Sequence, residues 1–128
     1  MARLLLVDDE PVLLNAMTRI LSDSGYDVVT ARSGAEALAM LSGSGVILPD
    51  LIITDVLMDD VDGLQLFSVI RQNPDWQHIP FVFTSASAKP TLEKLIAGSR
   101  RAMFVRKPFA VEALLKSVSE VLQAARQG

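Results

Sequence analysis

The sequence predicts a single α/β domain over residues 1–128, built on a doubly wound parallel sheet with helices on both faces. Half of the 128 residues are hydrophobic and 21% are charged, so the chain can form one domain with its own core. Short apolar runs alternate with segments of helical period, which is the pattern of repeated strand–helix units. The runs are rich in Val, Ile, Leu and Phe without polar alternation, as expected for parallel strands covered on both faces.

The apolar runs predict five short strands. They are Leu4–Asp8, Val28–Ala31, Leu51–Asp55, Phe81–Ser85 and Met103–Val105. Between the first two strands, a helix is expected with Leu13, Met17, Ile20 and Leu21 on one face. Gly25 offers this helix a C-terminal stop.

Four more helices are expected to cover the sheet. The second runs from about Ala35 to Leu41, with Ser33 as its N-cap residue. The third follows Gly63 and ends near Asn73, which precedes a proline. The fourth, with the weakest pattern, covers about Thr91–Ala97, and the fifth covers about Val111–Ala125.

Composition excludes several classes of protein. The chain has no cysteine, so it has neither disulfides nor a thiolate metal site, which suits a reducing cytosol. Its formal net charge is −3 and its basic residues form no long stripe, which argues against direct nucleic-acid binding. The first apolar run is too short for a signal peptide or a membrane span. We therefore expect a cytoplasmic protein without membrane contact.

Acidic residues follow two of the predicted strands, where like charges repel. "LLLVDDEP" ends the first strand in Asp8 and Asp9, and "LIITDV" ends the third in Asp55. The carboxyl ends of parallel strands meet at one rim, where ligands bind in such sheets. Ser85 and Lys107, at or just past the ends of strands four and five, are expected at the same rim.

Each of these residues also has a simpler interpretation. Asp8 and Asp9 before Glu10-Pro11 could cap the first helix, and taken alone this interpretation is favoured. Asp55 could be a turn residue at a strand end, and a lone lysine such as Lys107 is more often solvated surface. The arrival of these residues at one rim from four different strands favours a joint function.

The residue types at the rim predict a phosphoryl acceptor. Clustered carboxylates need a cation, and a hard ion such as Mg²⁺ prefers oxygen ligands. Lys107 could hold an anion, and the Ser85 hydroxyl could donate to it. One carboxylate would then act as the nucleophile and form an aspartyl phosphate.

Other motifs do not fit. Asp60, Asp62 and Gly63 suggest a calcium loop, but Met58 and Val69 occupy positions that such a loop reserves for oxygen ligands. The chain has no phosphate-binding GxxxxGK sequence, no GxSxG elbow and a single histidine, so a histidine-based triad has little support.

Four segments in order resemble the receiver domain of bacterial two-component response regulators, as in chemotaxis regulators. They are "VDDEP", "LIITDVLMDDVDG", "IPFVFTSA" and "KPF", and the resemblance covers nearly the whole chain. It implies a flavodoxin-like fold with strand order 2-1-3-4-5 and phosphorylation by a sensor histidine kinase or phosphotransfer protein. It also implies that Asp55 is the phospho-acceptor and that Asp9 and Asp55 bind Mg²⁺ directly. Asp8 would help through water, and the backbone carbonyl of Leu57 would complete the metal site.

The resemblance also assigns residues to the other strands. Lys107 would contact the phosphoryl group, and its peptide bond to Pro108 is expected to be cis. Ser85 would be the switch hydroxyl, and Phe104 would hold the aromatic switch position. Because side chains alternate along a strand, only one of Thr84 and Ser85 should face the site, and counting from the flanking motifs favours Ser85.

Two features depart from the family pattern. Asp59 stands where the family usually has proline, which adds a charge near the metal site. The segment "AGSRRAMFV" is unusual before strand five, and Gly98 lies farther from Lys107 than usual. The path of the fourth helix is therefore open.

The predicted function is a phosphorylation-activated switch with a changing partner surface, and no catalytic turnover beyond its own phosphorylation and dephosphorylation. The alternative is a receiver-like interaction module that works without phosphorylation. The output would be a downstream protein partner or an output domain outside this sequence. Arg100, Arg101 and Arg106 make one region basic, so an acidic or mixed protein partner is expected there.

Overall fold

The computed structural model describes residues 1–43, 45–56, 62–86, 94 and 101–127. Five parallel strands form one sheet in the order β2-β1-β3-β4-β5, as predicted. The strands are β1 (Arg3–Val7), β2 (Asp27–Ala31), β3 (Leu51–Asp55), β4 (Phe81–Ser85) and β5 (Ala102–Arg106). The predicted strands are confirmed, with ends that differ by no more than one residue.

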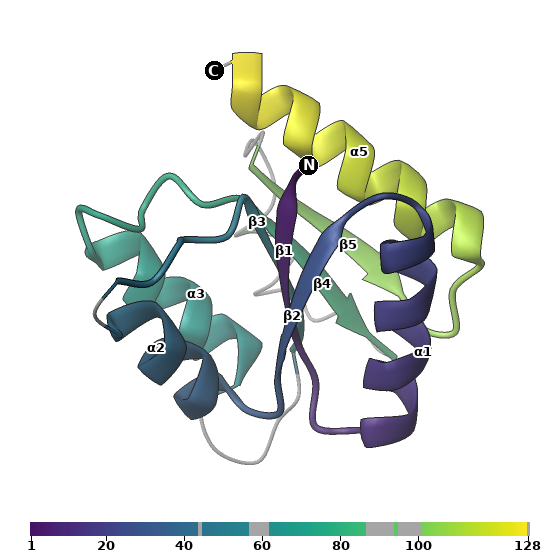
Figure 1. Cartoon of the computed structure of the whole chain (residues 1–128), viewed down its shortest axis with the longest axis horizontal. Coiled ribbons are helices and arrows are strands. Elements are labelled where there is room, and N and C mark those ends of the chain that lie inside the picture. Colours follow the sequence, from purple (N-terminus) through teal and green to yellow (C-terminus); the bar gives the residue numbers. More distant parts are fainter. Residues whose placement is uncertain (44, 57–61, 87–93, 95–100, 128) are drawn as a thin grey trace.

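Four helices lie in the described part of the chain. They are α1 (Pro11–Asp23), α2 (Gly34–Ser42), α3 (Gly63–Gln72) and α5 (Val111–Gln127). The helix expected at about Thr91–Ala97 lies outside the described residues, apart from Lys94. Helices α2 and α3 cover one face of the sheet, and α1 and α5 cover the other (Figure 1). None of the helices in these ranges is long and apolar enough to cross a membrane.

The predicted helix ends follow local chemistry. The Ser33 hydroxyl accepts a hydrogen bond from the backbone N–H of Glu36 at 3.0 Å and so caps α2. Helix α1 ends at Asp23, and Gly25 follows with φ of +96°, a conformation that glycine adopts without steric cost. The simpler interpretation, in which Asp8 and Asp9 cap α1, does not apply, because Glu10 is the N-cap residue and its side chain makes no capping hydrogen bond.

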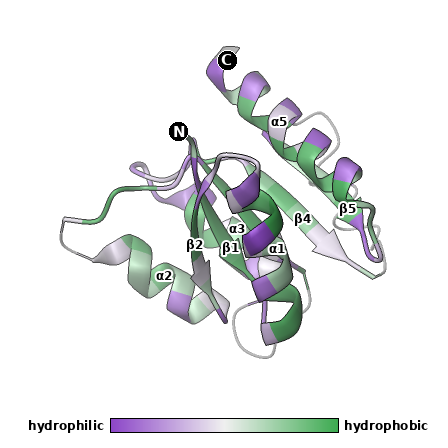
Figure 2. Ribbon diagram, turned by 45° about the vertical axis from the view of Figure 1, so that its right-hand side comes forward, coloured by the Kyte–Doolittle hydropathy of each residue, from purple (hydrophilic) through white to green (hydrophobic). Residues whose placement is uncertain are grey.

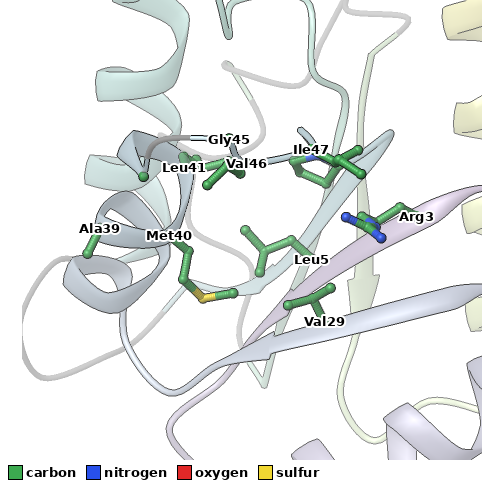
Figure 3. Close-up of a pocket in the computed structure, with 11 residues that line it drawn as sticks. Arg3, Leu5, Val29, Ala39, Met40, Leu41, Gly45, Val46 and Ile47 are labelled. Carbon is green, nitrogen blue, oxygen red and sulfur yellow. The ribbon is translucent and has the colours of Figure 1, made fainter.

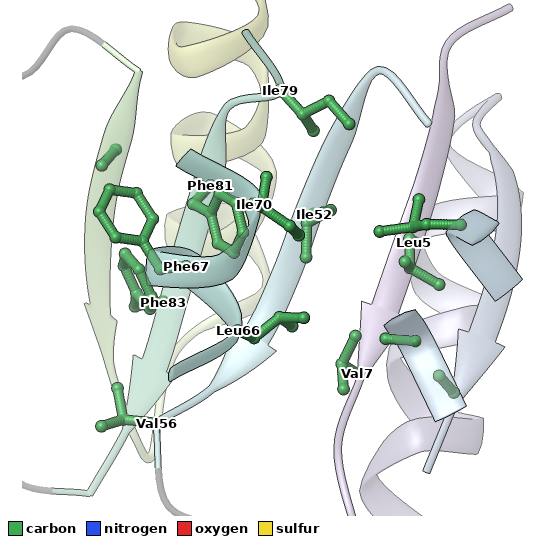
Figure 4. Close-up of a cluster of buried hydrophobic side chains, with 14 residues drawn as sticks. Leu5, Val7, Ile52, Val56, Leu66, Phe67, Ile70, Ile79, Phe81 and Phe83 are labelled. Carbon is green, nitrogen blue, oxygen red and sulfur yellow. The ribbon is translucent and has the colours of Figure 1, made fainter. Parts of the chain in front are cut away.

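The core has two layers, one on each face of the sheet. Under α2 and α3, the rings of Phe67, Phe81 and Phe83 pack with centroids 5.0–5.4 Å apart (Figure 4). Leu6 and Val82 belong to the layer under α1 and α5. Bands of hydrophobic and hydrophilic residues alternate along α5 (Figure 2), as expected for a helix with one buried face.

The strand register decides which residues meet at the carboxyl edge. Val7 pairs with Thr54, and Asp55 pairs with Thr84. Ser85 pairs with Arg106, the residue before Lys107. The chain runs from β1 outward to β2 and then crosses back to β3 on the other side of β1, so the switch in strand order lies between β1 and β3. Ligands bind at such points in doubly wound sheets.

Candidate functional site

An acidic cluster lies at the carboxyl ends of β1 and β3. Asp8, Asp9 and Asp55 each offer a carboxylate oxygen, and these oxygens lie within 4.8 Å of one another. Asp8 and Asp55 are 1% and 8% exposed, whereas Asp9 is exposed. Burial at this spacing makes the charges repel strongly, so the cluster needs a positive neighbour.

Lys107 supplies a positive charge to the cluster from the end of β5. Its Nζ donates to Oδ2 of Asp8 at 3.1 Å and to Oδ2 of Asp55 at 3.2 Å. The Lys107 side chain is 16% exposed, so water screens these ion pairs only in part. Oδ1 of Asp8 accepts a second hydrogen bond from the backbone N–H of Glu10 at 2.9 Å, which holds this carboxylate in place.

The acidic pair raises the pKa of Lys107. Burial alone would lower this pKa from 10.5, but the hydrogen bonds and charges of Asp8 and Asp55 outweigh that effect. Because the folded-state pKa lies above the unfolded value, protonated Lys107 stabilises the fold fully below pH 10.5. This contribution is lost as the pH rises through the raised pKa. At neutral pH the amine is therefore a fixed cation between the two carboxylates.

Gly63 brings the start of α3 against the end of β3. Its backbone N–H donates to the carbonyl of Val56 at 3.0 Å. A Cβ at this position would clash with the carbonyl oxygen of Asp55 and lie 3.0 Å from Cα of Val56. Only glycine allows this approach without displacing the backbone of Asp55. The sequence analysis used Gly63 to mark the start of the third helix and in a rejected calcium loop, and it missed this close approach to β3.

A capping box holds the same helix start. The side chain of Asp62 accepts from the backbone N–H of Gln65 at 2.9 Å, and the Gln65 side chain accepts from the backbone N–H of Asp62 at 2.9 Å. An acid three residues before a glutamine, ahead of an apolar run, is a pattern from which such a box can be predicted. Together with Gly63, it fixes the start of α3 beside the end of β3.

Thr84 and Ser85 are both buried at the end of β4, each 1% exposed. Phe83 belongs to the core layer under α2 and α3, and Phe104 packs against that layer. Since side chains alternate along a strand, Ser85 lies on the face of Phe83 and Phe104, and Thr84 lies on the opposite face. Ser85 and Phe104 therefore share one side of the sheet.

The remaining site residues are placed in part. The peptide bond between Lys107 and Pro108 is cis. Leu57, Asp59, Gly98 and Arg100 lie outside the described residues. The donors of the acidic cluster are carboxylate oxygens, which suit a hard divalent cation such as Mg²⁺ better than a soft transition metal.

A small apolar recess lies beside Lys107. It has a volume of about 360 Å³ and is lined by Leu13, Ala86, Lys107, Pro108 and Phe109. Val12, the second residue of α1, is 83% exposed. The acidic cluster is thus bordered by apolar surface from α1 and from the segment after β5. The sequence analysis did not find this surface, because Leu13 and Phe109 are far apart in the chain.

A larger cavity lies away from the acidic cluster. Its volume is about 500 Å³, and it opens between α2, the segment that follows α2, and strands β1 and β2 (Figure 3). Leu5, Val29 and Met40 line it, with Arg3 at one side. Arg3 donates from Nε to Oδ2 of Asp27 at 2.9 Å. This lining offers neither a nucleophile nor a group of metal ligands, so the chemistry remains with the acidic cluster.

Comparisons with known proteins agree with this site. The family described as "Response regulator receiver domain" matches residues 4–119. The transcriptional regulatory protein GlrR of Escherichia coli is 36% identical over 95% of this chain and 26% of its own length. The chain thus spans about a quarter of that relative.

Solved structures are similar over their whole length. The signal receiver domain of a histidine kinase from Syntrophus aciditrophicus has a TM-score of 0.85 at 30% identity, covering 100% of this chain and 95% of that one. The chemotaxis protein CheY4 of Vibrio cholerae has a TM-score of 0.80 at 31% identity, covering 94% and 98%.

Replacing Lys107 by methionine should make stability depend on Mg²⁺. Without Nζ, Asp8 and Asp55 lose their positive neighbour, and the free energy of unfolding should fall by about 1–3 kcal/mol in chelator, less than for a fully buried pair. A divalent cation that binds the folded state should recover much of this loss. Urea unfolding with chelator and with Mg²⁺ measures both effects.

The control for this prediction is Lys116→Met, which removes a lysine whose side chain is 78% exposed. It should change stability by less than about 0.5 kcal/mol in either condition. An equal loss for Lys107→Met in chelator and in Mg²⁺ would contradict the role of Lys107 as the neutralising cation.

Proposed function

The chain belongs to the family of response regulator receiver domains, and on that premise we propose that it is a switch phosphorylated on Asp55 in a Mg²⁺-dependent reaction. Members of the family are phospho-accepting modules of two-component signalling rather than catalytic enzymes. The observation that carries the proposal is the ion-paired acidic cluster at the β1/β3 edge, in which Lys107 Nζ lies 3.2 Å from Oδ2 of Asp55.

The acceptor chemistry follows from this arrangement. A carboxylate oxygen of Asp55 attacks the phosphorus of a phosphohistidine, the bond between phosphorus and the imidazole nitrogen breaks, and an aspartyl phosphate forms. The Nζ of Lys107, 3.2 Å from Oδ2 of Asp55, would contact the oxygens of the transferred phosphoryl group and neutralise part of their charge. Asp8, Asp9 and Asp55 would hold Mg²⁺ together with the backbone carbonyl of Leu57. The bound Mg²⁺ would neutralise part of the charge on the phosphoryl oxygens.

The phosphodonor would be a sensor histidine kinase or phosphotransfer protein. It must bring its phosphohistidine to the acidic cluster, so its contact surface has to lie beside Asp55. The exposed Val12 and the recess at Leu13 and Phe109 are apolar and border this edge. Burial of such side chains supplies binding energy that does not depend on the charges of the site. We propose this surface as the docking site of the donor.

Phosphorylation would be read through Ser85 and Phe104. The new phosphoryl group carries about −1.5 to −2 charges and three acceptor oxygens, and the Ser85 hydroxyl can donate to one of them. When Ser85 leaves its resting position, space opens on the face that it shares with Phe104. Phe104 is only partly buried and gains free energy by filling that space. The surface around β5 and α5 would then change for a downstream protein or an output domain.

Asp55→Asn should abolish phosphorylation. The amide keeps the shape of the side chain but is a poor nucleophile, so intact mass spectrometry should find no phosphoryl adduct after incubation with a small phosphodonor and Mg²⁺. The matched control is Asp23→Asn at the exposed end of α1, which should be modified like the unchanged protein. A persistent adduct in Asp55→Asn would place the acceptor elsewhere, and its absence from the unchanged protein would favour the phosphorylation-independent module.

Val12→Asp should slow phosphotransfer from a phosphorylated histidine kinase by about tenfold or more and leave the rate with a small phosphodonor unchanged. The substitution places a charge on the apolar surface that we assign to the donor, and loss of that contact weakens only a protein donor. The control, Ile47→Asp, changes another exposed apolar residue, 68% exposed on the segment that follows α2, and should be neutral in both assays. Equal slowing of both reactions by Val12→Asp would mean that Val12 acts on the site itself.

Ser85→Ala should uncouple the site from Phe104, whereas Thr84→Ala should not. In Mg²⁺, the phosphoryl mimic beryllofluoride should shift the backbone NMR signals of β5 and α5 in the unchanged protein and in Thr84→Ala. In Ser85→Ala, the shifts should remain at the acidic cluster and Lys107, because alanine has no hydroxyl to donate to the phosphoryl mimic. The reverse result for the two variants would make Thr84 the switch hydroxyl.

A further inference from the structure

A recess of about 500 Å³ lies at the amino edge of the sheet, opposite the acidic cluster. It is formed where Asp50 leads into β3, His78 leads into β4 and Arg101 leads into β5. The last turns of α5 close it with Leu122 and Arg126. Figure 1 shows the end of α5 over this edge, near the start of β1.

The structure divides the arginines that the sequence analysis grouped into one basic region. Arg101 immediately precedes β5, and Arg106 is its last residue. Five residues of strand separate their Cα atoms by about 16 Å. Arg106 therefore lies at the carboxyl edge of the sheet, the edge that carries the acidic cluster, while Arg101 lines the recess at the amino edge.

The recess is predominantly basic. Arg101, Arg126 and His78 line it, and among its lining residues Asp50 is the only carboxylate. Oδ2 of Asp50 already accepts a hydrogen bond from the backbone N–H of Arg3 at 2.7 Å. The two guanidinium groups thus outnumber the acid at neutral pH.

Arg71 adds positive charge behind the recess. Its Nη1 donates to the carbonyls of Gln77 and Ile79 at 2.8 and 2.7 Å, and its guanidinium stacks on the ring of Phe67. Burial, and secondly the charge of Arg101, lower the pKa of Arg71. Because both guanidinium groups are positively charged, an anion beside them would be stabilised.

The floor of the recess is apolar. Leu122 is 6% exposed and Ala125 is half-buried, and both line the recess, whereas Ile79 is fully buried and offers no surface to a ligand. A recess with arginines at its sides and apolar residues at its base is complementary to a peptide in which carboxylates flank an apolar side chain. The volume suits one or two side chains rather than a nucleic-acid backbone, which Asp50 would also repel.

We propose that this amino-edge recess binds an acidic peptide segment of a partner protein, with one apolar side chain on Leu122 and Ala125 and flanking carboxylates on Arg101 and Arg126. Guanidinium groups bind carboxylates through paired, charge-assisted hydrogen bonds, and this pairing would fix the orientation of the peptide's carboxylates. The inference is independent of phosphorylation at Asp55, because the recess lies at the opposite ends of the strands.

A short peptide with one leucine flanked by glutamates is the probe. Its binding should be followed by backbone NMR and by the fluorescence of Trp76, the only tryptophan, whose carbonyl accepts from the N–H of Ile79 at 2.9 Å. Arg101→Gln and Arg126→Gln should each weaken binding about two- to fivefold, the value of a partly exposed ion pair, and the double variant should weaken it further.

The matched control is Arg19→Gln, which removes an exposed arginine on α1 and should leave the affinity unchanged. Asp55→Asn should also bind the peptide normally, which separates this proposal from the proposed function. Unchanged binding in both Arg101 and Arg126 variants would overturn the proposal. It would also be overturned by equal binding of the peptide with lysines in place of glutamates, by shifts outside the recess, or by binding of inorganic phosphate or short RNA in preference to the acidic peptide.

Discussion

Repulsion between carboxylates at the ends of β1 and β3 is the constraint that the rest of the site satisfies. The parallel sheet forces Asp8 and Asp55 to the same edge, and burial makes their charges costly. Lys107 reduces this cost from the end of β5, within 3.2 Å of both carboxylates. A divalent cation and a phosphoryl group would change the same balance of charge. The site should therefore respond to both, because each would compete with or replace the ion pairs that Lys107 makes with Asp8 and Asp55.

Much of the fold could be predicted because its pattern is local. Each strand is a short run of apolar residues, and a parallel strand buried on both faces needs no alternation. Helix ends such as the Ser33 cap and the Gly25 stop depend on neighbouring residues alone. Local residue types are less informative at the start of α1. The residue types of Asp8 and Asp9 fit a cap, but the tertiary contact between Asp8 and Lys107 uses that side chain elsewhere.

The acidic cluster could be predicted from strand topology, since all parallel strands end at one edge. Two kinds of feature could not. Gly63 matters because of what a Cβ would meet on Asp55 and Val56, and such contacts follow only from coordinates. The second kind is the surroundings of residues at the two ends of one strand. Arg101 and Arg106 are near neighbours in sequence, but the full length of β5 separates them and gives them different surroundings.

The two edges of the sheet share β4 and β5 but differ in how easily they can move. Toward the amino edge, Phe81 is fully buried, packs against Phe67 and Phe83, and lies 5.6 Å from the guanidinium carbon of Arg71. Close-packed rings of this kind resist small displacements, because each shift removes contacts on one side and creates overlap on the other. Phe104, nearer the carboxyl edge, is only partly buried and is therefore less tightly held. A signal that begins at Asp55 should therefore spread sideways to β5 more readily than along β4 to the opposite recess. The fold can thus keep a phosphorylation-dependent surface and a constant one on the same two strands.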